Sequence, residues 1–116
     1  MKKLLALSAM IEAATGLGLL MAPAALARLL FGETLGTPAA VTVACVAATA
    51  LLAPGVACWL ATSDAQSRSA RGVVSAMVNY NLSAALVLGA AGIGSQLAGV
   101  GLWPAVLLHT AMAVCA

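Results

Sequence analysis

Charged residues are scarce in this sequence. Lys and Arg number five and Asp and Glu three, so that charged residues make up 7% of 116 residues and the net charge is +2. A soluble domain carries about 25% charged residues, and this composition therefore excludes an ordinary soluble fold. The small net charge also gives no indication of a nucleic-acid partner.

Residue sets that carry chemistry are equally sparse. Aromatic residues make up 3% of the chain, and His109 is its single histidine. No Ser–His–acid arrangement, glycine-rich phosphate loop or metal-ligand spacing occurs, which disfavours an enzyme and predicts no metal site. The three cysteines lack CxxC spacing and fall in apolar tracts, so we expect unpaired, buried thiols at Cys45, Cys58 and Cys115.

Apolar residues are what the chain has in abundance. They make up 64% of the sequence, and the mean hydropathy is +1.12. A bilayer crossing needs about 20 consecutive apolar residues. Three tracts approach or exceed that length and a fourth ends the chain, at about residues 4–21, 39–61, 73–93 and 97–116. The sequence therefore predicts an all-α, integral membrane four-helix bundle, with residues 1–116 forming one domain that lies in the lipid bilayer.

The segment between the first two tracts reads PAALARLLFGETLGTP. Pro23 is suited to a helix start, and Gly32 and Gly36 interrupt the apolar pattern. We expect a short helix lying in the membrane interface, with Arg28 and Glu33 among the lipid headgroups.

The distribution of Lys and Arg predicts the orientation. With a cytoplasmic N-terminus, four cations lie inside and only Arg28 lies outside, which satisfies the positive-inside rule and places both termini in the cytoplasm. The residues expected to anchor the chain at the two membrane surfaces are Lys2, Lys3, Arg28, Arg68, Arg71 and Trp103.

Two alternatives concern the ends of the chain. Residues 1–27 resemble a cleavable signal peptide with an Ala25-Leu26-Ala27 site, but Glu12 interrupts the apolar core such a signal needs, and a retained first span is favoured. At the other end, the fourth span either kinks at Pro104 or continues past Ala116.

Glu12 is the most unusual residue of the first span. Its neighbours three and four positions away are small or polar, whereas the opposite face is mostly bulky and apolar. Small faces pack against other helices and bulky faces meet lipid, so we expect Glu12 to point into the bundle.

Other unusual residues fall at a similar depth, roughly 9 to 12 Å from the inner edge. They are Asn79 and Asn81 in the third span, His109 in the fourth and Pro54, which is expected to kink the second and to free a backbone carbonyl. We hypothesise a buried Glu12–His109–Asn79 cluster. Asn81 lies roughly 160° around the helix from Asn79, so the two cannot face the same neighbour.

This polar layer leaves several functions open. The sequence favours an accessory or scaffold-like membrane module, as part of a redox or transport system. The alternative is a proton-linked small-solute carrier or channel that uses Glu12 and His109. Packing between helices, or a site for a quinone, haem or lipid, would also explain the polar layer. A single histidine supplies both axial ligands of a haem only if two chains meet. No cofactor is specifically implied, and a homo-oligomer or a larger membrane complex remains open.

Several segments together resemble a known group. Besides Glu12 they read GLGLLMAPAALARLLFG, GVACWLA, VNYN and GLWPAVLLH. The chain is similar over nearly its whole length to small bacterial four-span membrane proteins that are loosely DoxX-like. This resemblance implies a multi-pass bundle in the bacterial inner membrane, and some DoxX-type proteins are membrane subunits of quinone-linked sulfur oxidoreductases. The basic residue that the group places early in its second span is missing from VTVACVAATA, which shifts the expected partner of Glu12 to His109.

Overall fold

The chain folds into helices without any strand, in a computed structural model that describes residues 1–116. The predicted all-α fold class is therefore confirmed. The elements are α1 (Lys2–Met21), α2 (Pro23–Phe31), α3 (Pro38–Ala61), the 3₁₀ turn η1 (Thr62–Asp64), α4 (Arg68–Gly94) and α5 (Leu102–Cys115).

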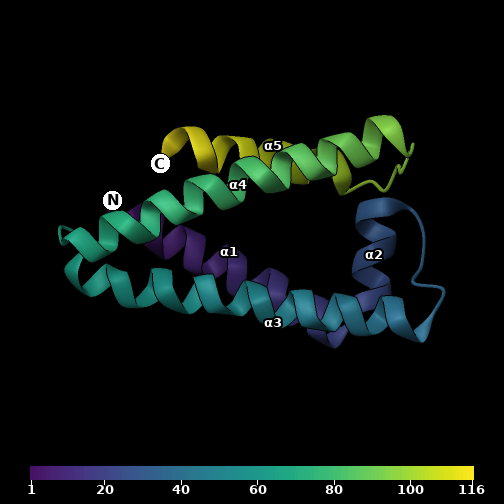
Figure 1. Ribbon diagram of the computed structural model, residues 1–116, viewed down its shortest axis with the longest axis horizontal. Helices are drawn as coiled ribbons and strands as arrows, with labels where there is room; N and C mark the ends of the chain where they lie inside the picture. Colours follow the sequence, from purple (N-terminus) through teal and green to yellow (C-terminus); the bar gives the residue numbers. More distant parts are fainter.

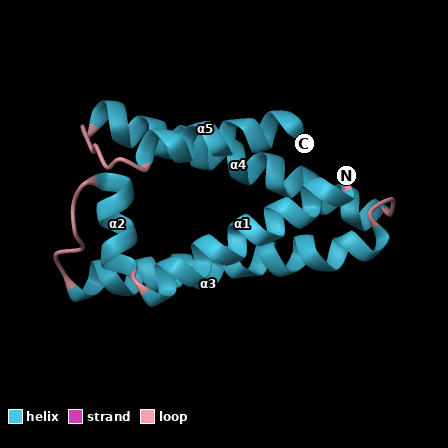
Figure 2. Ribbon diagram, turned by 180° about the vertical axis from the view of Figure 1, so that it is seen from behind, coloured by secondary structure: helices cyan, strands magenta, loops and turns pink.

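The long helices form two antiparallel pairs (Figure 1). One pair is α1 with α3, and the other is α4 with α5. Both termini and the α3–α4 connection lie at one end of the molecule. At the other end the pairs are farther apart, and α2 stands crosswise between them, as the view from behind also shows (Figure 2).

Local sequence explains where the helices begin and end. The Thr37 side chain accepts a hydrogen bond from the backbone N–H of Ala40 at 3.1 Å, and Pro38 follows it at the start of α3. Ser67 caps α4 in the same way, accepting from the N–H of Ala70 at 3.0 Å. Gly32 ends α2 in the left-handed conformation, with φ of 76°.

Three helical segments are long and apolar enough to cross a membrane, namely α1, α3 extended through η1, and α4. The fourth predicted span is shorter than expected, because its helix begins at Leu102 and not at Leu97. Residues 95–101 instead form a connection in which the N–H groups of Ala98 and Gly101 donate to the carbonyls of Phe31 (3.2 Å) and Leu29 (2.8 Å). The connection thus binds carbonyls at the end of α2 that would otherwise lack partners.

Small residues bring α1 and α3 close together. A Cβ added at Gly16 would lie 2.9 Å from Leu52 Cδ2 and 3.0 Å from the carbonyl oxygen of Ala48. Gly55 is similarly close to α1: a Cβ added at Gly55 would lie 3.3 Å from the Cβ of Glu12. Close backbone approach through small residues is a typical means of helix association where no water drives apolar surfaces together.

Much of the apolar surface faces outward. Met21 is 82% exposed and Val114 is 80% exposed, and large apolar side chains of α3 and α4 are exposed as well. A compact set of buried residues from α1, α3, α4 lies near the termini: Leu5, Ala9, Cys58, Ala70 and Met77. An apolar exterior around a small core is the arrangement that lipid, and not water, stabilises.

Candidate functional site

Glu12 lies near the middle of α1 and is only 3% exposed. It belongs to the buried face of the helix, together with Ser8, Ala9 and Gly16, while Met10 on the other side is exposed. The 3.6-residue period of the helix therefore directs the carboxyl group toward the neighbouring helices.

No basic side chain accompanies Glu12 into the interior. All five Lys and Arg residues are exposed: Lys2, Lys3, Arg28, Arg68 and Arg71. The two other acidic residues, Glu33 and Asp64, are also exposed. Glu12 is thus the only buried acidic side chain of the protein.

Tyr80 of α4 lies next to Glu12, and both side chains line the same cavity. It is the only tyrosine of the chain and is half-buried. Tyr80 was not among the predicted site residues. Its position in the middle of an apolar span nevertheless indicates a polar partner inside the bundle, because buried tyrosine hydroxyls generally have one. Tyr80 occupies the place that the sequence hypothesis gave to His109.

His109 of α5 instead contacts Asn81 of α4. Its Nδ1 lies 2.7 Å from the Asn81 side-chain oxygen. The Asn81 amide nitrogen donates to the carbonyl of Met77 at 2.8 Å, so the oxygen is left to accept from His109. Nδ1 therefore carries the proton, and in the neutral ring Nε2 is an acceptor.

A contact between the Tyr80 and His109 rings connects the Glu12–Tyr80 pair with the His109–Asn81 pair. The Tyr80 and His109 ring centroids lie 5.7 Å apart with an interplanar angle of 84°, an edge-on arrangement. Polar side chains thus follow one another from Glu12 through Tyr80 and His109 to Asn81, across α1, α4 and α5.

The hypothesised Glu12–His109–Asn79 cluster is not found: Glu12 and His109 line one cavity, but His109 contacts Asn81 and Asn79 lies outside. Asn79 is exposed, and its side-chain oxygen accepts from the Ser83 hydroxyl at 3.5 Å on the same helix. Asn81 is buried in its place. The small neighbours of Asn79 suggested a packing face, but the buried face of α4 carries Ala70 and Met77, and that face includes position 81.

Pro54 lies within α3, which continues as one helix from Pro38 to Ala61. Its neighbour Gly55 is buried and lies against Glu12 and the backbone of Ala9 and Ala13. Pro54 is thus adjacent in sequence to the residue of α3 that packs against the turn of α1 carrying Glu12. Trp103, expected as an interface anchor, is partly exposed beside Gly92 near the start of α5.

A cavity of about 170 Å³ lies beside this set of polar groups. Four helices supply its walls, and we refer to it as the Glu12 cavity. Its lining residues are Ile11, Glu12, Thr15, Leu26, Leu30, Tyr80, Leu88, Ala105, Leu108 and His109. The contribution of α2 is apolar and closes the side between the two helix pairs, while Arg28 of the same helix lines a separate outer depression.

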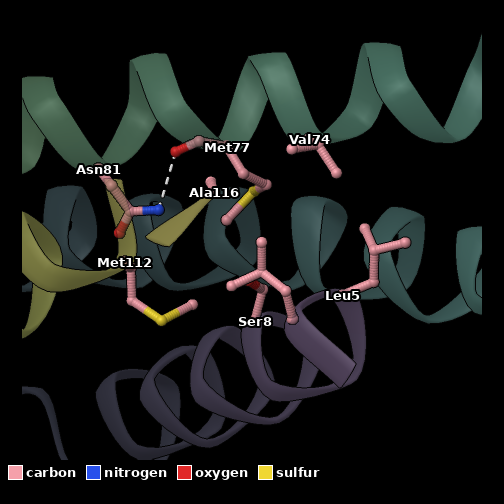
Figure 3. A pocket seen from close by; sticks show the side chains of 8 residues that line it. Leu5, Ser8, Val74, Met77, Asn81, Met112 and Ala116 are labelled. Atoms are coloured by element: carbon pink, nitrogen blue, oxygen red, sulfur yellow. Dashed lines mark hydrogen bonds between the residues drawn. The ribbon is translucent and has the colours of Figure 1, made fainter. Parts of the chain in front are cut away.

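A much smaller space lies on the other side of Asn81, toward the termini (Figure 3). Its volume is about 10 Å³, close to the minimum that holds one water molecule. Ser8 and Asn81 provide polar groups at this space, and Leu5, Met77 and Met112 surround them. The polar side chains of the interior therefore border one cavity and one water-sized gap.

The remaining reactive groups do not gather into a site. No group of three or more His, Cys, Asp or Glu residues is placed to hold a metal ion. All three cysteines are free, but the expected burial holds only for Cys58: Cys45 is half-buried, and Cys115 is exposed next to the last residue of the chain.

Comparison of the chain with protein-family models, with curated proteins and with solved structures finds no match.

Proposed function

We propose that the protein is a multi-pass protein of the bacterial inner membrane in which α1, α3, α4 and α5 form a four-helix bundle. The outward apolar side chains and the three membrane-length helices support this placement. Lys2, Lys3, Arg68 and Arg71 belong to the end that holds the termini, which the positive-inside rule assigns to the cytoplasm. The helix α2 then lies at the opposite surface as the interfacial helix. Reporter fusions at the termini and in residues 33–37 test this orientation, and opposite reporter activities are expected.

Within that frame, the protein is a proton-linked carrier or channel for a small solute. The observation that supports this function is the enclosed Glu12 carboxyl group beside the Glu12 cavity, with no basic residue near it. An unpaired carboxylate costs several kcal/mol or more in a medium of low dielectric constant. Glu12 must therefore hold a proton or meet a cation from outside, and exchange between these two states is the elementary step of proton-linked transport.

The surrounding groups support such an exchange. Tyr80 and His109 line the same cavity as Glu12. The water-sized gap at Ser8 and Asn81 extends the series of polar groups toward the cytoplasmic end. Intramembrane carboxyl and imidazole groups in series are typical of proton relays.

The test is proton movement in liposomes. Purified protein is reconstituted with an entrapped pH-sensitive dye, and small solutes of several chemical classes are added on one side. We expect protein-dependent proton movement that Glu12→Gln abolishes and that the matched control Glu33→Gln, at an exposed loop carboxylate, retains. Absence of proton movement for all solutes, or full movement with Glu12→Gln, contradicts the function.

The second candidate is an accessory or scaffold-like subunit of a redox or transport complex, the role to which the DoxX-like resemblance points. It is favoured by an apolar groove of about 360 Å³ between the outer faces of α1 and α3. Its lining includes Met10, Val56 and Trp59, all of which are exposed. Native mass spectrometry of protein extracted from its own membranes tests this role: a stoichiometric partner chain supports it, and a bare monomer contradicts it.

A further inference from the structure

We propose that the Glu12 cavity binds a small alkylammonium ion, a primary amine cation whose apolar body is about the size of a six-membered ring. This inference rests on the proposed function, because it assigns the chemical class of the solute that exchanges with the proton. Charge, hydrogen-bonding capacity and size each point to this class.

Every Lys and Arg side chain is exposed, so no basic residue balances a negative charge in the cavity. With a proton on Glu12 the cavity is neutral, and without it the cavity carries one negative charge. A cation that enters together with loss of the proton leaves the total charge of the site unchanged. An anionic solute would add a second negative charge beside Glu12, and like charges in an apolar interior repel strongly.

The hydrogen-bonding groups favour a donor-rich solute. The Glu12 carboxylate accepts only, and His109 offers Nε2 as an acceptor because Asn81 occupies its Nδ1 proton. The Tyr80 hydroxyl is directed to Glu12. An ammonium group has three donors and no acceptor, so it matches the acceptors that the cavity leaves free.

The size and the remaining lining define the body of the solute. An apolar cavity of about 150 Å³ accommodates benzene, and the Glu12 cavity measures about 170 Å³. Away from the polar groups its walls are hydrocarbon: Ile11, Leu26, Leu30, Leu88, Ala105 and Leu108. A six-membered hydrocarbon ring is therefore of suitable volume, and a sugar or amino acid would leave polar groups without partners.

Few titratable groups face Glu12, so proton competition is simple to interpret. They are Tyr80 on α4, His109 on α5 and the Cys58 thiol on α3. The helix α2 contributes only Leu26 and Leu30. A proton on Glu12 removes the negative charge of the cavity and a proton on His109 adds a positive one, so either change weakens binding of a cation.

The test compares cyclohexylamine with cyclohexanol by isothermal titration calorimetry on the full chain in lipid nanodiscs. The two ligands share a ring and differ in charge. An alkylamine like that of lysine, with a pKa of about 10.4, stays protonated from about pH 8 to about pH 5. We expect cyclohexylamine to bind roughly tenfold or more tightly than cyclohexanol at the upper pH, and this preference to decrease as the pH is lowered and Glu12 takes up a proton.

Variants identify the site. Glu12→Gln is expected to lower the affinity for cyclohexylamine by roughly tenfold or more and to leave cyclohexanol unaffected. Glu33→Gln, at an exposed position, should bind both like the parent protein. Ala105→Leu fills the cavity and should weaken both ligands equally. If Glu12→Gln fails to fold, Ala105→Leu and the pH series on the parent protein still test the proposal.

Equal affinity for the two ligands, no binding of either, or amine binding that Glu12→Gln and Ala105→Leu both leave intact would overturn the proposal. These outcomes are distinct from failure of the proposed function. Proton movement in liposomes with a solute of another class would refute the amine proposal alone. Amine binding without any proton movement would refute transport and leave the binding site standing.

Discussion

At the end of the molecule that holds both termini, α1, α3 and α4 pack directly against one another, whereas at the opposite end α2 lies between the two helix pairs. The first end is filled by Leu5, Ala9, Cys58, Ala70 and Met77. The second end contains the Glu12 cavity and is held by backbone hydrogen bonds from the α4–α5 connection to α2. Space for a solute therefore exists where direct packing of the long helices stops.

A single added methyl group should destabilise the end that holds α2 more than the end that holds the termini. A Cβ at Gly99 would overlap the carbonyl oxygen of Leu29, which belongs to the backbone and cannot move aside as a side chain can. Gly99→Ala is expected to displace the connection from α2, with loss of the bonds from Ala98 and Gly101, and to lower stability by about 3 kcal/mol. Thermal unfolding followed by circular dichroism in detergent measures the change.

The control for that substitution is Gly89→Ala, because no atom lies within 4 Å of the Cβ position at Gly89. It should stabilise α4 by about 0.5 to 1 kcal/mol through helix propensity alone. A Gly99→Ala protein with the stability of the parent would show that the connection does not hold α2. Cyclohexylamine binding should also weaken in Gly99→Ala, since α2 forms one wall of the cavity.

The α1–α3 pair provides the next largest effect. A Cβ at Gly16 would meet the Leu52 side chain at 2.9 Å and the Ala48 carbonyl at 3.0 Å. Because the leucine can turn aside, Gly16→Ala should cost less than the change at Gly99, about 1 to 2 kcal/mol. Gly18→Ala, two residues along the same helix with open space around it, should not destabilise. Equal unfolding midpoints for the two variants would contradict close packing at Gly16.

Sequence reasoning predicted the helices better than their termini and contacts. Runs of apolar residues predict α1 and α3 to within two residues, and Gly32 marks the end of α2, whereas α4 begins at Arg68, five residues before the apolar run that predicted it. The start of α5 was missed because residues 97–101 are apolar, and hydropathy does not reveal that their backbone binds α2. Contacts between distant segments depend on tertiary structure, which a local pattern does not contain.

In the polar site as well, local sequence predicts burial but not contacts between helices. Helix periodicity alone places Glu12 on the face with Ser8 and Gly16, so its burial follows from local sequence. The pairing of Tyr80 with Glu12 and of Asn81 with His109 does not, because it depends on how α4 rotates about its axis against α5 and α1. The small residues near Asn79 pointed to the wrong face, whereas Met77 occupies the buried one.

That rotation of α4 leads to the smallest and most specific prediction. Asn81→Ala removes the partner of His109 Nδ1 and the bond to the Met77 carbonyl, and should lower stability by about 1 kcal/mol, within the range of hydrogen bonds between membrane helices. Asn79→Ala, at an exposed position, should change stability by less than about 0.5 kcal/mol.

The two asparagine variants also differ in what they do to the site. Without Asn81 the His109 ring is free to exchange its tautomer and orientation, so Nε2 is an acceptor for only part of the time. Affinity for cyclohexylamine should therefore fall in Asn81→Ala and remain at the parent value in Asn79→Ala. The reverse result would restore the Asn79 cluster that the sequence suggested, and it would require α4 to be turned by nearly half a revolution.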